Sequence, residues 1–168
     1  MKPSPKPSII YLMINQKIAQ ILLLTCMLIL TSCKDIPRDS YKTLENIKTN
    51  KLLKVGVVQH PPWVDEIAEQ PSGREVDIVE KFAKHLNSNI KWVKTAEHKL
   101  VEQLVTGKID LLIGGFTTDT VWQDQVALTR PYFIKDHEEH VFLAQPGENA
   151  FIVELEQFLK AQNYVPYS

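Results

Sequence analysis

Cysteine is scarce in this sequence of 168 residues, and both copies, Cys26 and Cys33, lie near the N-terminus. The chain after Cys33 can therefore form no disulfide and no thiolate metal site. That part also lacks an excess of basic residues, since it holds 16 lysines and arginines against 20 aspartates and glutamates. Such a balance does not favour nucleic-acid binding, which calls for a basic face. The length suits one domain but not comfortably two.

Acidic residues are absent before Asp35, and three lysines precede an apolar run over residues 18–30. This arrangement is the charged region and the apolar region of a secretory signal. The run is too short for a membrane span, which needs about 20 apolar residues. We therefore expect residues 1–32 to be a signal that is removed.

The signal ends in Leu30-Thr31-Ser32-Cys33, which resembles the bacterial lipobox. The resemblance implies that Cys33 becomes the N-terminus and carries diacylglycerol and a further acyl chain such as palmitate. Several acyl chains together anchor a protein stably to a membrane. Lys34 stands where an Asp would mark inner-membrane retention, which favours the outer membrane. The alternatives are an ordinary signal peptide or an N-terminal anchor with an incidental cysteine.

Turn residues and apolar periodicity divide the remaining chain into alternating strands and helices. We expect residues 33–42 to be a tether that begins with the lipidated cysteine, 43–162 to be one lobe, and 163–168 to be a tail. Strands are expected at residues 54–59, 89–93, 109–113, 126–129 and 141–144. Helices are expected over residues 75–86 and 97–106, around Leu44 and Ile47 with Ser40 as the cap, and from Asn149 as the cap of a last helix. This order predicts a three-layer α/β/α fold with a mainly parallel sheet.

The segment from Ile109 to Phe133 carries the main functional signal. It joins a buried strand, a Gly-Gly turn, a hydroxyl-rich helix start and a second strand that ends in Arg-Pro-Tyr. This order predicts free backbone N–H groups and hydroxyls just past the carboxyl end of a strand. Small ligands bind at that edge in open α/β sheets, so the segment indicates solute recognition.

Four segments in the same order resemble the N-terminal lobe of the bacterial extracellular solute-binding proteins of family 3. They are LLKVGVVQHPPW, GREVDIVEKFAKHL, GKIDLLIGGFTTDT and ALTRPYF. The family contains the type 2 periplasmic binding proteins of polar amino-acid ABC transporters. The resemblance implies a lobe of that fold. A full member closes two lobes over its ligand, and we expect the second lobe to be missing here.

The resemblance implies ligand-binding roles for three residues, and the sequence offers Thr118 beside them. Trp63 corresponds to the aromatic residue that packs on the ligand side chain. Gly115 and Thr117 correspond to the residues that meet the polar head of the ligand, and Thr118 is a further binding group beside them. The alternative for Trp63 is a core or rim aromatic, and the alternative for the two threonines is an N-cap cluster that starts a short helix.

Two positions depart from the family pattern. The threonine that donates to the ligand carboxylate is Asp119 here, and the arginine that pairs with that carboxylate is Trp122. An Arg–carboxylate pair is strong and directional, and Asp119 would repel an anion. We therefore expect an apolar, aromatic or cationic ligand, with Phe116 and Trp122 as stacking surfaces beside Trp63. Arg130 is a binding candidate that could face the cleft, with a surface or hinge position as the alternative.

Patterns of catalysis and metal binding are not recognisable. His137-Glu138-Glu139-His140 lacks the H-E-x-x-H spacing, and we interpret this segment as a solvated loop. No Ser-His-Asp order or nucleophile elbow is visible. We therefore expect no enzymatic activity, no cofactor and no metal.

The sequence thus predicts a lipid-anchored periplasmic protein that captures or senses a small molecule for an ABC-type transporter or a sensor. The alternative is a protein-interaction module, or a homodimer, that uses the face left open by the missing lobe. An exposed apolar patch would favour that alternative. The residues that could supply one are Trp63, Phe116, Trp122 and Tyr132.

Overall fold

The computed structural model describes residues 39–65 and 70–164, together with Lys17 and Gln20. The predicted signal, Cys33, most of the tether and most of the tail lie outside the described residues. The fold below is that of the compact unit from Arg38 to Ser168. Among the described residues, no helix combines the length and the apolar character needed to cross a membrane.

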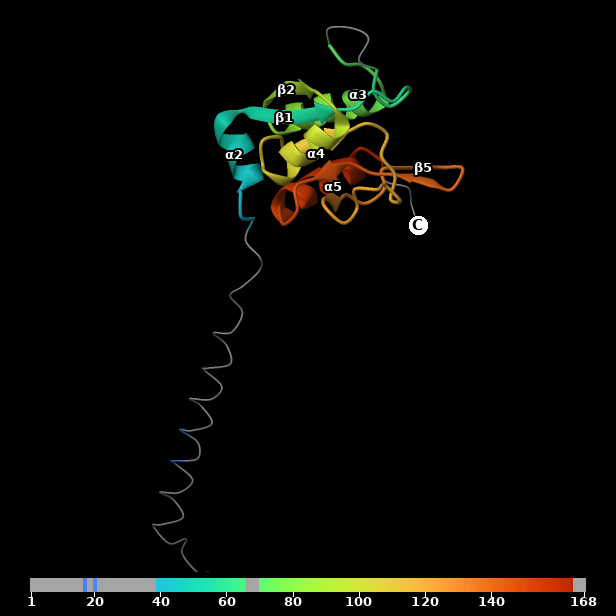
Figure 1. Cartoon of the computed structure of the whole chain (residues 1–168). Coiled ribbons are helices and arrows are strands. Elements are labelled where there is room, and N and C mark those ends of the chain that lie inside the picture. The colour runs from blue at the N-terminus through green and yellow to red at the C-terminus, as the bar shows by residue number, and fades with distance from the viewer. Residues whose placement is uncertain (1–16, 18–19, 21–38, 66–69, 165–168) are drawn as a thin grey trace, which may run out of the picture. The chain divides into compact units, whose positions relative to one another are not determined.

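A five-stranded sheet lies at the centre, in the order β2-β1-β3-β7-β4 (Figure 1). The strands are β1 (Leu52–Val57), β2 (Asn89–Lys94), β3 (Leu111–Ile113), β4 (Ala127–Leu128) and β7 (Leu143–Ala144). β1 is parallel to β2 and β3, whereas β7 is antiparallel to both of its neighbours, β3 and β4. Four strands therefore run in one direction and β7 runs against them, so the expectation of a mainly parallel sheet is confirmed.

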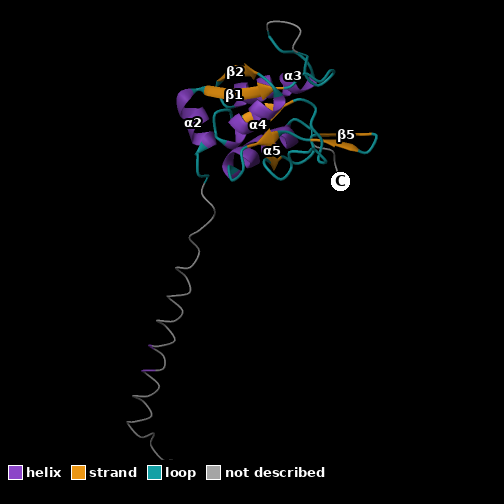
Figure 2. Cartoon of the chain, in the orientation of Figure 1, coloured by secondary structure: helices purple, strands orange, loops and turns teal. Residues whose placement is uncertain are grey.

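Helices cover both faces of the sheet (Figure 2). They are α2 (Thr43–Asn50), α3 (Arg74–His85), α4 (Glu97–Val105) and α5 (Asn149–Ala161). α2, α3 and α5 share one apolar cluster with β1 and β3, while α4 packs in a second cluster on the other face. The three-layer α/β/α fold class is thereby confirmed. All of β3 is buried, as is typical of a strand with both faces covered.

The apolar face of α3 is the one that the three- and four-residue spacing predicts. Its members are Val76, Val79, Phe82, Ala83 and Leu86, and all five are buried. In α4 the prediction is wrong at Val105, which is 36% exposed. This residue ends the helix just before the turn at Gly107, where the chain leaves the sheet surface.

The segment before each of α2 and α5 supplies a carboxylate that caps the start of the other helix. The predicted caps Ser40 and Asn149 are therefore wrong. The buried carboxylate of Glu148 accepts hydrogen bonds from the N–H groups of Tyr41 and Thr43, both at 2.7 Å. In return, the carboxylate of Asp39 accepts a hydrogen bond from the N–H of Ala150 at 3.0 Å. Each carboxylate satisfies N–H groups that a helix start leaves unpaired. Because both caps are long-range, local sequence rules do not find them.

A hairpin of β5 (Phe133–Lys135) and β6 (Glu138–His140) projects from the sheet (Figure 1). Its two turn residues, Asp136 and His137, have φ values of 51° and 69°. Two positive φ values match the twist of a tight hairpin. The expected solvated loop over residues 137–140 is therefore wrong, because most of it is a strand and the His140 side chain is buried.

Candidate ligand-binding site

The parallel strands β1 and β3 end side by side, with Val57 paired to Ile113. The residues that follow them line an open cleft of about 430 Å³. Its lining is Val58, Gln59, His60, Glu97, Gly114, Gly115, Phe116, Thr117, Asp119, Thr120 and Val121. Four of the predicted site residues lie together there, namely Gly115, Phe116, Thr117 and Asp119. The other four, Trp63, Thr118, Trp122 and Arg130, do not line the cleft.

The floor of the cleft is a Gly-Gly turn whose N–H groups form hydrogen bonds with another residue of the protein. The N–H groups of Gly114 and Gly115 donate to one oxygen of Glu75, at 2.7 and 3.0 Å. The hydroxyl of Tyr132 donates to the other oxygen at 2.5 Å. The expectation that these two N–H groups are free is therefore wrong, because an internal carboxylate already occupies them.

Glu75 is fully buried at the start of α3. Burial raises the pKa of this carboxyl to about 7, and the hydrogen bonds from Tyr132 and the two glycines lower it by less. Burial and the nearby Glu75 carboxyl raise the pKa of the Tyr132 hydroxyl. Sequence reasoning missed Glu75 because a glutamate in the first turn of a helix ordinarily complements the helix dipole at the surface.

Gly115 fits its place only because it has no side chain. Its φ is +68°, and an added Cβ would lie 2.4 Å from Trp63 Cδ1 and 2.7 Å from His60 Nδ1. The ring of Trp63 thus lies directly against the Gly-Gly turn, on the side away from solvent.

Trp63 is a core residue, which corresponds to the second of the two interpretations made from the sequence. It is 8% exposed, and its ring lies against His140 with centroids 3.9 Å apart. Phe133 meets it edge-on at 5.3 Å. The guanidinium of Arg74 lies over this pair, 4.3 Å from the Phe133 centroid and 5.3 Å from that of Trp63. The protein's own cation thus occupies the position in which a cationic ligand would stack on Trp63.

The buried side chain of His140 packs against Trp63 in this cluster. Burial lowers the pKa of its imidazole. Its Nδ1 is the one buried side-chain polar atom, within the described part of the chain, that has no hydrogen-bond partner. The backbone of this strand residue bridges to Thr117, so the hairpin directly supports the rim of the cleft.

The rim after Phe116 is a run of turns rather than the expected short helix. The hydroxyl of Thr117 donates to Asp119, and the N–H of Thr118 donates to the carbonyl of Glu139 at 3.0 Å. The hydroxyl therefore orients an acidic side chain instead of capping a helix. Thr118 ties the rim to the hairpin and offers its N–H to no ligand.

Glu97 lines the cleft as Asp119 does, and it was not predicted from the sequence. The indole N–H of Trp122 donates to Glu97 Oε1 at 2.6 Å, so the indole holds a carboxylate in place. A signal was available, because Glu97 begins α4 soon after β2, whose carboxyl end lies at the same edge of the sheet. Acidic residues at that edge are site candidates.

The charge of the cleft is acidic. Among the described residues, Glu97 and Asp119 are the acidic groups that line it, and no lysine or arginine does. Within the described residues, neither carboxylate is within ion-pair distance of a basic side chain. His60 Nδ1 lies 2.9 Å from the carbonyl oxygen of Gly114. The cleft therefore presents mainly hydrogen-bond acceptors.

Arg130 lies at the surface, as the alternative interpretation had it. Its side chain is 81% exposed and its Nε lies 3.5 Å from a carboxylate oxygen of Glu156 on α5. Its backbone N–H donates to the same carboxylate at 2.8 Å. The residue thus joins the end of β4 to α5.

The four aromatic residues that could have supplied an exposed patch do not form one. Trp63, Phe116 and Tyr132 are buried, and Trp122 is half-buried. Their rings are used inside the two apolar clusters. The observation that would have favoured an interaction module is therefore absent among these residues.

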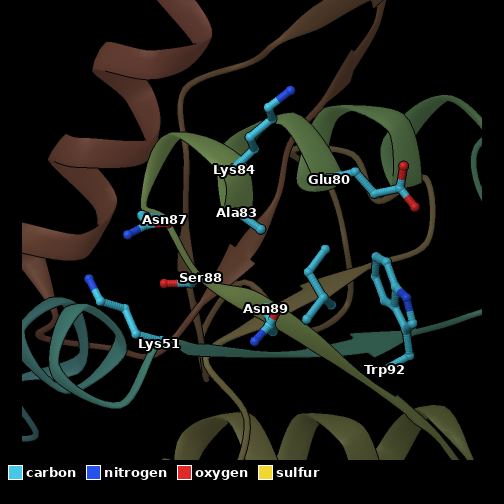
Figure 3. Close-up of a pocket in the computed structure, with 9 residues that line it drawn as sticks. Lys51, Glu80, Ala83, Lys84, Asn87, Ser88, Asn89 and Trp92 are labelled. Carbon is cyan, nitrogen blue, oxygen red and sulfur yellow. The ribbon is translucent and has the colours of Figure 1, made fainter.

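A second hollow, of about 590 Å³, lies beside α3 and β2 (Figure 3). Its lining includes Lys51, Lys84 and Glu80, together with Asn87, Ser88 and Asn89. Lys51 precedes β1 and Asn89 begins β2, so this part of the hollow is at the amino ends of the strands. Ligands of open α/β sheets bind at the carboxyl ends, which favours the first cleft as the functional site.

A three-layer lobe with a cleft at the carboxyl ends of its parallel strands is the ligand-binding lobe of a type 2 periplasmic binding protein. The chain belongs to the bacterial extracellular solute-binding proteins, family 3, whose family model matches residues 53–163.

A relative from Campylobacter jejuni, named "Probable histidine-binding protein", is 27% identical over 108 residues. The match covers 64% of this chain and 42% of the relative, so the chain spans less than half the length of that relative. Among solved structures, a point mutant of arginine-bound domain 1 of TmArgBP, from T. maritima, matches with a TM-score of 0.66 and 23% identity. That match covers 73% of this chain and 99% of the domain.

The ancestral amino acid-binding protein AncCDT-1, described as a precursor of cyclohexadienyl dehydratase, matches with a TM-score of 0.64 and 15% identity. The match covers 73% of this chain and 95% of AncCDT-1. These structural matches show the fold, and the family is mainly one of non-enzymatic solute binding.

Proposed function

We propose that the protein captures a small organic cation on the periplasmic side of a bacterial envelope and presents it to an ABC-type transporter or a sensor. The observation that carries the proposal is the cleft at the ends of β1 and β3, in which two carboxylates face solvent without a basic partner among the described residues. A charge that is held without a partner favours an oppositely charged ligand, and a charge-assisted hydrogen bond contributes about 1.5–3 kcal/mol.

The comparisons support a cationic ligand and binding by one lobe of this fold. Domain 1 of TmArgBP is described as arginine-bound, and this chain covers 99% of that domain. A lobe of this kind, without a second lobe closed over it, is therefore compatible with ligand binding. The Campylobacter relative is named for histidine, which is also a nitrogen base.

The site residues in this proposal are Glu97, Asp119, Thr117, His60 and Phe116. The carboxylates bind the cation, and Thr117 orients Asp119. The imidazole of His60 lines the opposite side of the cleft, and Phe116 gives an apolar wall. Trp122 acts through Glu97, which it orients by its indole N–H.

Thermal melts of the full chain in detergent, with arginine, lysine and histidine, test the binding. A ligand at a hundred times its Kd should raise the stability by about 2.7 kcal/mol. Asp119→Asn and Glu97→Gln keep the hydrogen bonds from Thr117 and Trp122 and remove the charge, so both should abolish the effect. Asp124→Asn is the matched control, since Asp124 is an exposed carboxylate on the same run of turns outside the cleft. A stabilising effect that survives both cleft variants would place the ligand elsewhere.

We propose that a lipid on Cys33 anchors the protein to the outer membrane. The N-terminal peptide of the wild type should begin at Cys33 and carry the mass of the lipid, and Cys33→Ser should remove that mass. A wild-type N-terminal peptide without lipid mass would show that the anchor is not a lipid on this cysteine.

A further inference from the structure

Several of the hydrogen-bond donors around the cleft are already occupied inside the protein. The N–H groups of Gly114 and Gly115 are taken by Glu75, and the N–H of Thr118 is taken by Glu139. The N–H of Thr120 donates to the carbonyl of Thr117 at 3.1 Å. These four N–H groups are therefore not available to a ligand carboxylate.

Side-chain donors at the cleft are occupied in the same way. The Thr117 hydroxyl is bound to Asp119, and the indole N–H of Trp122 is bound to Glu97. His60 Nδ1 lies at 2.9 Å from the carbonyl of Gly114, so this nitrogen carries the proton of the neutral ring. The other ring nitrogen is then an acceptor. Gln59 and Thr120 are the lining residues whose side chains still have a donor to offer.

A ligand carboxylate would therefore meet two negative charges and few donors. A buried or half-buried anion without donors is strongly unfavourable. An ammonium or guanidinium, in contrast, brings its own donors to Glu97, Asp119 and His60. We infer that the cleft selects amines or guanidines that carry no carboxylate over the corresponding α-amino acids. This inference rests on the proposed function, because it concerns the ligand class of the same cleft.

Matched ligand pairs isolate the carboxylate. Agmatine and arginine, cadaverine and lysine, and histamine and histidine differ only in that group. Titration calorimetry of the full chain in detergent should give at least about tenfold tighter binding for the ligand without the carboxylate in the pair that binds, which corresponds to about 1.4 kcal/mol.

Two variants connect the preference to the cleft. Asp119→Asn and Glu97→Gln should each weaken agmatine at least about fivefold and bring its Kd closer to that of arginine, while Asp124→Asn should leave both unchanged. Residues 119 and 97 keep a carbonyl oxygen in these variants, so folding is preserved, and thermal melts of the unliganded variants check this.

The outcomes separate this inference from the proposed function. If arginine, lysine or histidine binds as tightly as the matched ligand without the carboxylate, the inference about the ligand class is wrong. The proposal of solute binding then still holds. An absence of binding for all six ligands overturns both. A preference for the amine that Asp119→Asn and Glu97→Gln leave intact also overturns the inference, since the preference then arises at another site.

Discussion

Replacing Glu75 with glutamine tests how the floor of the cleft is held. The glutamate is fully buried and receives three hydrogen bonds, from Gly114, Gly115 and Tyr132. Glutamine keeps an acceptor for the two glycine N–H groups and has a donor for the Tyr132 oxygen, but it does not titrate. The change therefore removes the charge from the interior while a filled and hydrogen-bonded site is retained.

The expected magnitude follows from the pKa of Glu75, which burial raises from 4.5 to about 7. The folded protein holds the proton more tightly than the unfolded chain. The contribution of this group to stability is thus complete below pH 4.5 and is lost as the pH rises to about 7. At about 1.4 kcal/mol for each pH unit between these two values, the loss is about 3 kcal/mol. Glu75→Gln should be free of this loss.

Urea unfolding followed by tryptophan fluorescence, from pH 4.5 to 8 at constant ionic strength, measures the effect. The free energy of unfolding of Glu75→Gln minus that of the wild type should rise by about 3 kcal/mol over this range. The difference between the two proteins cancels the groups that titrate alike in both. Glu80→Gln, exposed on the same helix, is the control and should show no such rise. A difference that is flat with pH, or that falls, would refute the account of a carboxyl held in a poorly solvated site.

Four further substitutions test the packing and the helix cap. Gly115→Ala and Gly147→Ala both place a Cβ at a positive φ, but only the first meets an obstacle, at 2.4 Å from Trp63. Gly115→Ala should therefore be less stable than Gly147→Ala by about 1–3 kcal/mol in thermal melts, and equal losses would contradict the close packing. Glu148→Ala leaves two N–H groups at the start of α2 without their acceptor. It should lower the free energy of unfolding by about 2–3 kcal/mol and speed hydrogen exchange at those amides, whereas unchanged exchange would argue against the cap. Arg74→Ala removes the cation over the aromatic pair. Its stability loss should be about 0.5–1 kcal/mol with a change in tryptophan emission, and identical emission would show that the cation is not seated there.

The sequence predicts the layers of this fold well because they depend on periodic burial. The inner face of α3 follows three- and four-residue steps, and every predicted member is buried. The strand β3 is recognisable as an apolar run because helices cover both of its faces. These patterns are local, so one sequence is enough to find them.

Long-range pairing is what the sequence does not show. Nothing local indicates that Glu148 caps a helix 105 residues earlier in the chain, at Thr43. In the same way, Glu75 reaches the Gly-Gly turn from 39 residues away. The residue types are unremarkable at each position, and the partners become visible only when the helices are packed.

The candidate site was half predictable. The Gly-Gly turn and the hydroxyls after it indicated the correct edge of the sheet, and Gly115, Phe116, Thr117 and Asp119 do line the cleft. Which of their polar groups remain available to a ligand was not predictable, because that depends on internal partners such as Glu139. The sequence therefore located the cleft and misjudged its donors.

A crystal structure of the protein grown with agmatine would test the central claim most directly. The account predicts the guanidinium or ammonium of the ligand within hydrogen-bond distance of Glu97 and Asp119, with the N–H groups of Gly114 and Gly115 still bound to Glu75. Agmatine in the hollow beside α3 and β2, or the two glycine N–H groups turned from Glu75 toward a ligand, would contradict it.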